Sequence, residues 1–137
     1  MFKGVNWLAV VAGGIFNWLF GGLYFDYLMA WWFRKIIPNP GAILDFTNPA
    51  TLIGLALSLC VATGLATVMA RAGTRTIAGA MAIAILVCFC FDSTVYLAYI
   101  SAGEKPQLQL FIAVYDQVSY VLTAVVIRLL TRGRPRS

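Results

Sequence analysis

Four long apolar stretches constrain this chain more than any other feature of its sequence. They run over residues 5–25, 51–70, 77–101 and 108–130. Each is close to the ~20 apolar residues that cross the hydrocarbon core of a bilayer. The 137-residue chain is 61% hydrophobic and only 11% charged, a composition that excludes a soluble domain of this size. We therefore predict an all-α, polytopic membrane protein with one domain over residues 1–137, in which four transmembrane helices form an antiparallel up-down bundle.

The first apolar stretch has one feature of a signal peptide, because Lys3 precedes it. The stretch is too long for the apolar region of such a peptide, however, and it contains Asn6 and Asn17 without a small-residue cleavage pattern. We interpret it as a retained helix. The aromatic and basic residues at 27–35 then predict a short segment lying at the membrane interface.

The basic residues are distributed unevenly between the two predicted faces of the membrane. One face has seven of them, namely Lys3, Arg71, Arg75, Arg128, Arg132, Arg134 and Arg136. The other has three, namely Arg34, Lys35 and Lys105. Cytoplasmic segments carry the excess of Lys and Arg, so both termini are predicted to be cytoplasmic. The C-terminal arginines could also attract anionic lipid or nucleic acid, but a stop-transfer anchor explains them better, and we expect no nucleic-acid partner.

Histidine is absent, which removes the usual ligand or base of zinc, haem and Ser-His sites. Cys60, Cys88 and Cys90 all fall within apolar stretches, where we interpret them as small core residues. A membrane hydrolase with a metal needs several Asp, Glu or His ligands, and only two carboxylates lie at depth. We therefore expect no metal, no cofactor and no enzymatic activity.

Those two carboxylates, Asp92 and Asp116, are the most informative residues. Asp92 lies nine residues before Ser101, and Asp116 lies eight residues after Leu108. At ~1.5 Å per residue both lie roughly 12 to 14 Å below the same surface. A charge near the bilayer centre costs at least ~2.5 kcal/mol, so each group must be protonated, paired or turned towards a polar cavity. The short connection between the last two helices makes them neighbours and predicts a buried carboxylate pair.

Other polar side chains are predicted at a similar depth. They are Asn17 in the first helix, Ser58 in the second, Tyr96 in the third and Tyr120 in the fourth. We expect the hydroxyl of Tyr96 or Tyr120 to bond a carboxyl group. Together with the two aspartates, these residues form the predicted site for a small ligand or ion.

Small and polar residues recur every three or four positions along the first helix. They are Asn6, Ala9, Gly13, Asn17, Gly21 and Tyr24. Such a stripe lets a neighbouring backbone approach closely, so it favours a helix-packing seam over a ligand site.

The tripeptide Asn48-Pro49-Ala50 matches the Asn-Pro-Ala signature of water channels, but a single copy occurs. We interpret Asn48 as a helix N-cap with Pro49 at the first helical position.

Both ends of the chain resemble a known family. Residues 5–12, the sequence Gly-Gly-Leu-Tyr-Phe at 21–25 and Trp31 resemble the opening of the bacterial membrane family called domain of unknown function 1761. Residues 105–111 and 115–120 resemble its closing hairpin and last helix. The resemblance implies a four-helix protein of the bacterial inner membrane and supplies no catalytic residues.

Two functions remain open at this point. In the first, the aspartates and their polar neighbours bind or translocate a proton, a cation or an amine-bearing lipophile. In the second, the chain is a non-catalytic accessory or assembly subunit, in a homo-oligomer or a larger membrane complex, and its polar layer fixes helix register. The sequence does not identify a ligand.

Overall fold

A computed structural model describes residues 4–37, 45–103 and 105–132, and these residues are helical without any strand. The elements are α1 (Trp7–Leu23), a π-helical turn η1 (Tyr24–Leu28), α2 (Ala30–Ile36), α3 (Pro49–Arg71), α4 (Ile77–Ser101) and α5 (Pro106–Leu130). Four helical segments, with α1 and η1 counted as one, are long and apolar enough to cross a membrane. The four predicted stretches are therefore confirmed as helices, with ends displaced by a few residues.

Parts of the sequence interpretation lie outside the described residues. They concern Lys3, Arg134 and Arg136, three of the basic residues counted above.

The ends of the helices follow local signals in the sequence. Asn48 caps α3 by accepting a hydrogen bond from the backbone N–H of Ala50 at 3.0 Å, with Pro49 at the first helical position. This confirms the capping role predicted for the Asn-Pro-Ala tripeptide. Gly73, with φ of +66°, ends α3, and the N–H of Thr74 bonds the carbonyl of Met69 at 3.0 Å. This left-handed ending turns the chain tightly into α4.

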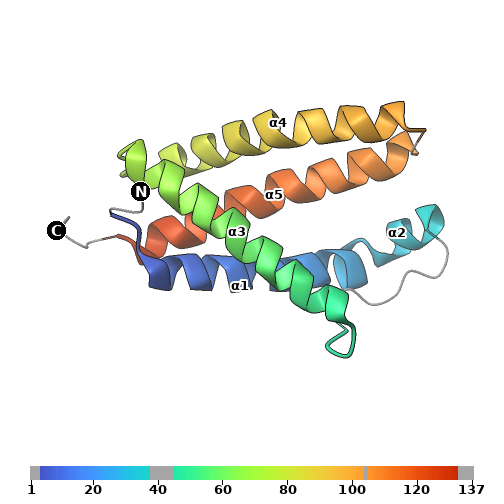
Figure 1. The fold of residues 1–137 in the computed structure, drawn as a ribbon, viewed down its shortest axis with the longest axis horizontal. Coiled ribbons are helices and arrows are strands. Elements are labelled where there is room, and N and C mark those ends of the chain that lie inside the picture. The colour runs from blue at the N-terminus through green and yellow to red at the C-terminus, as the bar shows by residue number, and fades with distance from the viewer. Residues whose placement is uncertain (1–3, 38–44, 104, 133–137) are drawn as a thin grey trace.

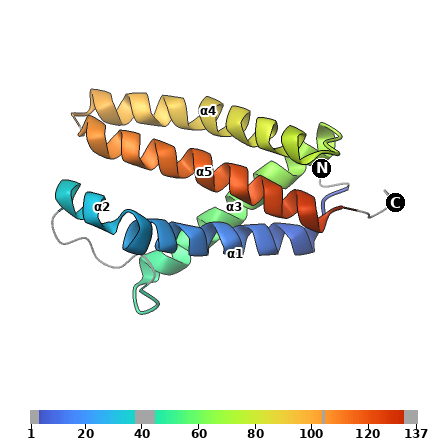
Figure 2. The same cartoon turned by 180° about the vertical axis from the view of Figure 1, so that it is seen from behind.

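The helices α1, α3 and α5 pack against one another, whereas α4 packs mainly on α5. Figures 1 and 2 show α3 crossing the pair formed by α1 and α5, with α4 at the outer side of α5. As a result, only 17% of the apolar window of α4 is buried inside the chain, against 44% for the first helical segment.

The predicted small-residue stripe lies against α5 and is buried except at Asn6. A Cβ atom on Gly13 would lie 2.8 Å from a side-chain carbon of Ile127, and one on Gly21 would lie 2.7 Å from the hydroxyl of Tyr115. Asn6 at the start of α1 donates to the backbone carbonyl of Leu130 at 3.3 Å. The stripe is therefore a helix-packing seam along the length of α1.

One end of the bundle is filled by rings, which we call the aromatic cluster. Its members are Phe20, Tyr24, Phe25, Trp32, Phe33, Phe111 and Tyr115. Consecutive residues Tyr24 and Phe25 both contact the rings of Phe111 and Tyr115, at centroid distances of 4.8 to 5.5 Å. They lie in η1, where the wider turn changes which face of the helix the following residues present. The segment that the sequence places at the membrane interface contains the short helix α2, which this cluster ties to α5.

Candidate functional site

Five of the six side chains predicted to form one polar layer fall into two groups. Asn17 and Ser58 meet between α1 and α3, while Tyr96 and Asp116 meet between α4 and α5. The two groups differ in burial and in their hydrogen-bond partners, so each is described separately.

The first group, which we call the polar node, is centred on the side-chain amide of Asn17. Its Nδ2 donates to the hydroxyl of Ser58 at 3.1 Å. Its Oδ1 accepts from the hydroxyl of Ser119 and from that of Thr123, the latter at 3.2 Å. All four side chains are buried, and they come from α1, α3 and α5.

Each buried side-chain nitrogen and oxygen of the polar node has a hydrogen-bond partner. Among the described residues, no buried side-chain nitrogen or oxygen lacks a hydrogen-bond partner. An amide shared by three helices fixes their rotation and their relative height, because any slip would leave a buried polar group unpaired. The node therefore holds the α1, α3 and α5 helices in register.

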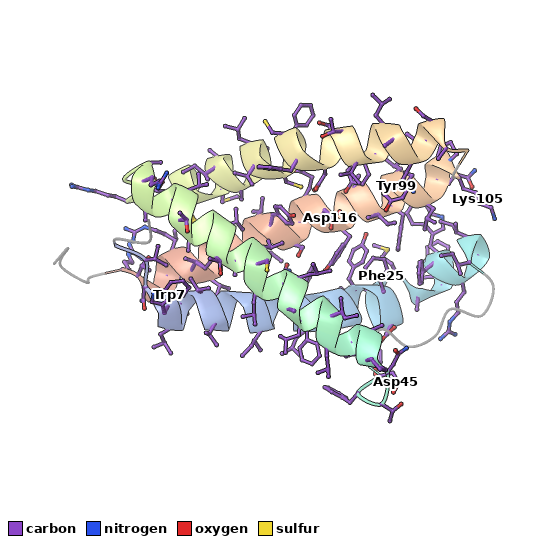
Figure 3. The ribbon with its side chains drawn as sticks, viewed as in Figure 1. Trp7, Phe25, Asp45, Tyr99, Lys105 and Asp116 are labelled. Atoms are coloured by element: carbon purple, nitrogen blue, oxygen red, sulfur yellow. The ribbon has the colours of Figure 1, made fainter. Side chains whose placement is uncertain are left out.

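The second group, which we call the acidic site, consists of Cys88, Asp92, Tyr96 and Asp116. The hydroxyl of Tyr96 donates to Oδ2 of Asp116 at 2.5 Å, joining α4 to α5. The thiol of Cys88 donates to Oδ2 of Asp92 at 2.8 Å, one turn away on α4. Figure 3 labels Asp116 near the middle of α5. The tyrosine–carboxyl bond predicted from the sequence is thus present for Tyr96.

The carboxyl groups are less enclosed than the sequence suggested. Asp92 and Asp116 are both half-buried, and no acidic side chain in the described part of the chain is buried. The reason is the position of α4, which packs mainly on α5, so the other helices do not cover the junction. Asp92 and Asp116 nevertheless interact electrostatically, so two ionised carboxylates would repel each other here.

Tyr120 belongs to neither hydrogen-bonded group. Its ring is half-buried and packs against the apolar core that contains Ala124 and Ile127. Asp116, Ser119, Tyr120 and Thr123 form a polar stripe along α5. In the structure the stripe has two flanks, and Ser119 and Thr123 lie on the flank that faces α1. Their spacing of four residues indicates that they lie on the same side of α5. The position of α1 is needed to identify Asn17 as their hydrogen-bond partner.

The acidic site contains one thiol, one phenol and two carboxyl groups. Within residues 4–37, 45–103 and 105–132, no group of three or more His, Cys, Asp or Glu side chains could hold a metal ion. Two carboxyl groups with a phenol donor can instead take up and release a proton, or accept hydrogen bonds from an ammonium group.

Comparisons with known proteins give no further guidance. No family model matches the chain, and searches of curated proteins and of solved structures also found no match.

Proposed function

We propose that the chain is an integral protein of the bacterial inner membrane with both termini in the cytoplasm. The four long segments alternate in direction in this proposal and form an antiparallel bundle. Helices of 23 to 25 residues, such as α3, α4 and α5, extend ~35 Å, enough to cross a hydrocarbon core of ~30 Å. The contacts of α1 with α5 support the alternation, because later residues of α1 meet earlier residues of α5. The excess of basic residues at the end that bears the termini supports the orientation.

Within this arrangement, the acidic site binds a proton or a small cationic ligand, and its protonation is coupled to ligand occupancy. The observation that carries this proposal is the meeting of Asp116 and Tyr96 beside Asp92, with both carboxyl groups half-exposed on neighbouring helices. In the described chain, the side chains that bond the two carboxyl groups are a phenol and a thiol, and neither is a base. Since charge at this depth is costly, the site favours either a bound proton or a bound cation.

The test is cation binding by the purified full-length chain in detergent, with tetraphenylphosphonium as the probe. Binding should be stronger at pH 8 than at pH 6, because the cation competes with protons for the same carboxyl groups. Asp116→Asn and Asp92→Asn should abolish this pH dependence while the chain still inserts. Asp26→Asn, the same chemical change at the end of the first segment, should retain it. Unchanged binding in both site variants would refute the proposal.

A second candidate function is an accessory or assembly subunit that binds no small ligand. The exposure of α4 favours it, since large side chains on different sides of this helix, such as Phe89, Phe91 and Leu97, are 66 to 70% exposed. In that case Asp92→Asn and Asp116→Asn should lower thermal stability or change the mass of the complex in native mass spectrometry. A monomer that tolerates both substitutions would exclude this function. Both candidates are non-enzymatic, and both are compatible with the proposed membership of the domain of unknown function 1761 family.

A further inference from the structure

Arginines from three parts of the chain gather at the end of the bundle where α1 begins and α5 ends. Arg71 is the last residue of α3, Arg75 lies in the connection to α4, Arg128 is in the last turn of α5, and Arg132 follows that helix. Figures 1 and 2 place the α3–α4 connection and the end of α5 at the same end of the molecule. We call these four residues the arginine end.

A direct contact holds the arginine end together. The guanidinium of Arg128 donates through one Nη to the backbone carbonyl of Arg75 and through the other to the hydroxyl of Thr131 at 3.4 Å. Arg128 therefore joins α5 to the connection between α3 and α4. Arg71 and Arg75 flank the tight turn at Gly73, and the side chains of Arg71, Arg75 and Arg132 are exposed.

Acidic groups in the described part of the chain do not balance the charge at this end. Among the described residues, the acidic side chains are Asp26, Asp45, Asp92 and Asp116, and none of them lies on the helix ends that form the arginine end. Asp92 and Asp116 lie well inside α4 and α5.

The opposite end of the bundle differs, because its two lysines contact protein groups and Asp26 and Asp45 lie at the same end. Lys105 donates to the backbone carbonyl of Ile36 at 3.5 Å, and the ammonium of Lys35 lies 4.7 Å from the ring centroid of Trp31. Figure 3 shows Asp45 and Lys105 towards this end.

We propose that the arginine end binds the phosphate of an anionic phospholipid headgroup. This inference rests on the membrane placement proposed above. Arg71 and Arg128 mark the ends of apolar spans, so their guanidinium groups lie at the depth of lipid phosphates. Guanidinium groups bind phosphate through paired hydrogen bonds, and several exposed arginines without acidic neighbours attract anionic lipid.

The experiment measures lipid retention by native mass spectrometry on the full-length chain, with phosphatidylglycerol and phosphatidylcholine of the same acyl chains. Wild type should retain phosphatidylglycerol in preference to phosphatidylcholine. Each arginine near the surface contributes about a fivefold preference, so Arg71→Gln with Arg75→Gln should reduce it about 25-fold. The matched control, Arg34→Gln with Lys35→Gln, removes two charges at the other end and should leave the preference nearly unchanged.

Three results would overturn the inference. The first is equal retention of both lipids by wild type. The second is an equal loss of preference in the two double variants. The third is complete displacement of bound phosphatidylglycerol by inorganic phosphate at the same concentration. Extraction with alkaline carbonate tests the membrane placement separately. A chain that stays in the membrane pellet but has no preference for phosphatidylglycerol refutes the lipid site alone.

Discussion

Substitution of Gly14 by alanine provides the most direct test of helix packing in this bundle. A Cβ atom at Gly14 would lie 2.6 Å from Cδ2 of Leu59 and 3.0 Å from its Cα. Ordinary carbon–carbon contacts are ~3.5 to 4.0 Å. The leucine side chain can rotate, but its Cα moves only with α3. Helices α1 and α3 must therefore separate by roughly 0.5 to 1 Å to accept the methyl group.

The expected cost follows from this separation. Overpacking of a close contact costs ~1 to 3 kcal/mol. Alanine has a helix propensity about 1 kcal/mol more favourable than that of glycine, and this gain offsets part of the stability lost by overpacking. Gly64→Ala isolates that gain, because a Cβ atom at Gly64 on α3 would have no atom within 4 Å. Since the propensity gain is common to both variants, Gly14→Ala should be less stable than Gly64→Ala by about 1 to 3 kcal/mol.

The assay is unfolding in mixed micelles, in which sodium dodecyl sulfate is titrated against a mild detergent and helix content is followed by circular dichroism. The free energy of unfolding is compared between the two alanine variants and wild type. Equal stability of Gly14→Ala and Gly64→Ala would refute the close approach of α1 to α3.

Three further predictions concern hydrogen bonds. Asn17→Ala should lower the free energy of unfolding by about 2 kcal/mol in the same assay, because three buried bonds of ~0.6 kcal/mol each are lost, and Asn17→Leu should not restore it. Tyr96→Phe should shift the carboxyl band of Asp116 in infrared difference spectra with a stability loss of about 1 kcal/mol, and an unshifted band would contradict their bond. Two hydrogen bonds from Thr47, of which the side-chain bond has the larger effect, hold the pKa of Asp45 below its usual value. Its contribution to stability is complete above a pH of about 4 and is lost as pH falls through the lowered pKa, so Asp45→Asn should remove that part of the acid dependence of thermal unfolding.

The helices and their ends were largely predictable from the sequence, because they depend on local chemistry. An apolar run of about 20 residues predicts a spanning helix by itself. The Asn-Pro pair that starts a helix and the glycine that ends one act only on residues a few positions away. Asn48 accordingly has the predicted role, and Gly73 ends α3. The packing seam on α1 was predictable for the same reason, since the period of the helix places Gly13, Asn17 and Gly21 on one face.

The grouping of the polar side chains was not predictable, because it depends on how far helices rotate and cross. Equal depth suggested a single layer containing Asn17, Ser58 and both aspartates. The depth of a residue gives its height along the helix axis. It does not determine the direction around the axis in which the side chain points. The crossing of α3 over α1 brings Ser58 to Asn17, and the outer position of α4 leaves Asp92 and Asp116 half-exposed. The π-helical turn also had no signal in the hydrophobic pattern, since it adds one residue without changing composition.

That turn bears on how this chain aligns with any relative. A π-helical turn holds one more residue than an α-helical turn, so η1 is equivalent to a single insertion between Tyr24 and Leu28. A homologue whose first helix is regular throughout would be one residue shorter there. Its alignment with this chain would need a gap in that window to match both Asn17 and the helix α2. The presence of such a gap would identify, from sequence alone, the relatives that lack the π-helical turn.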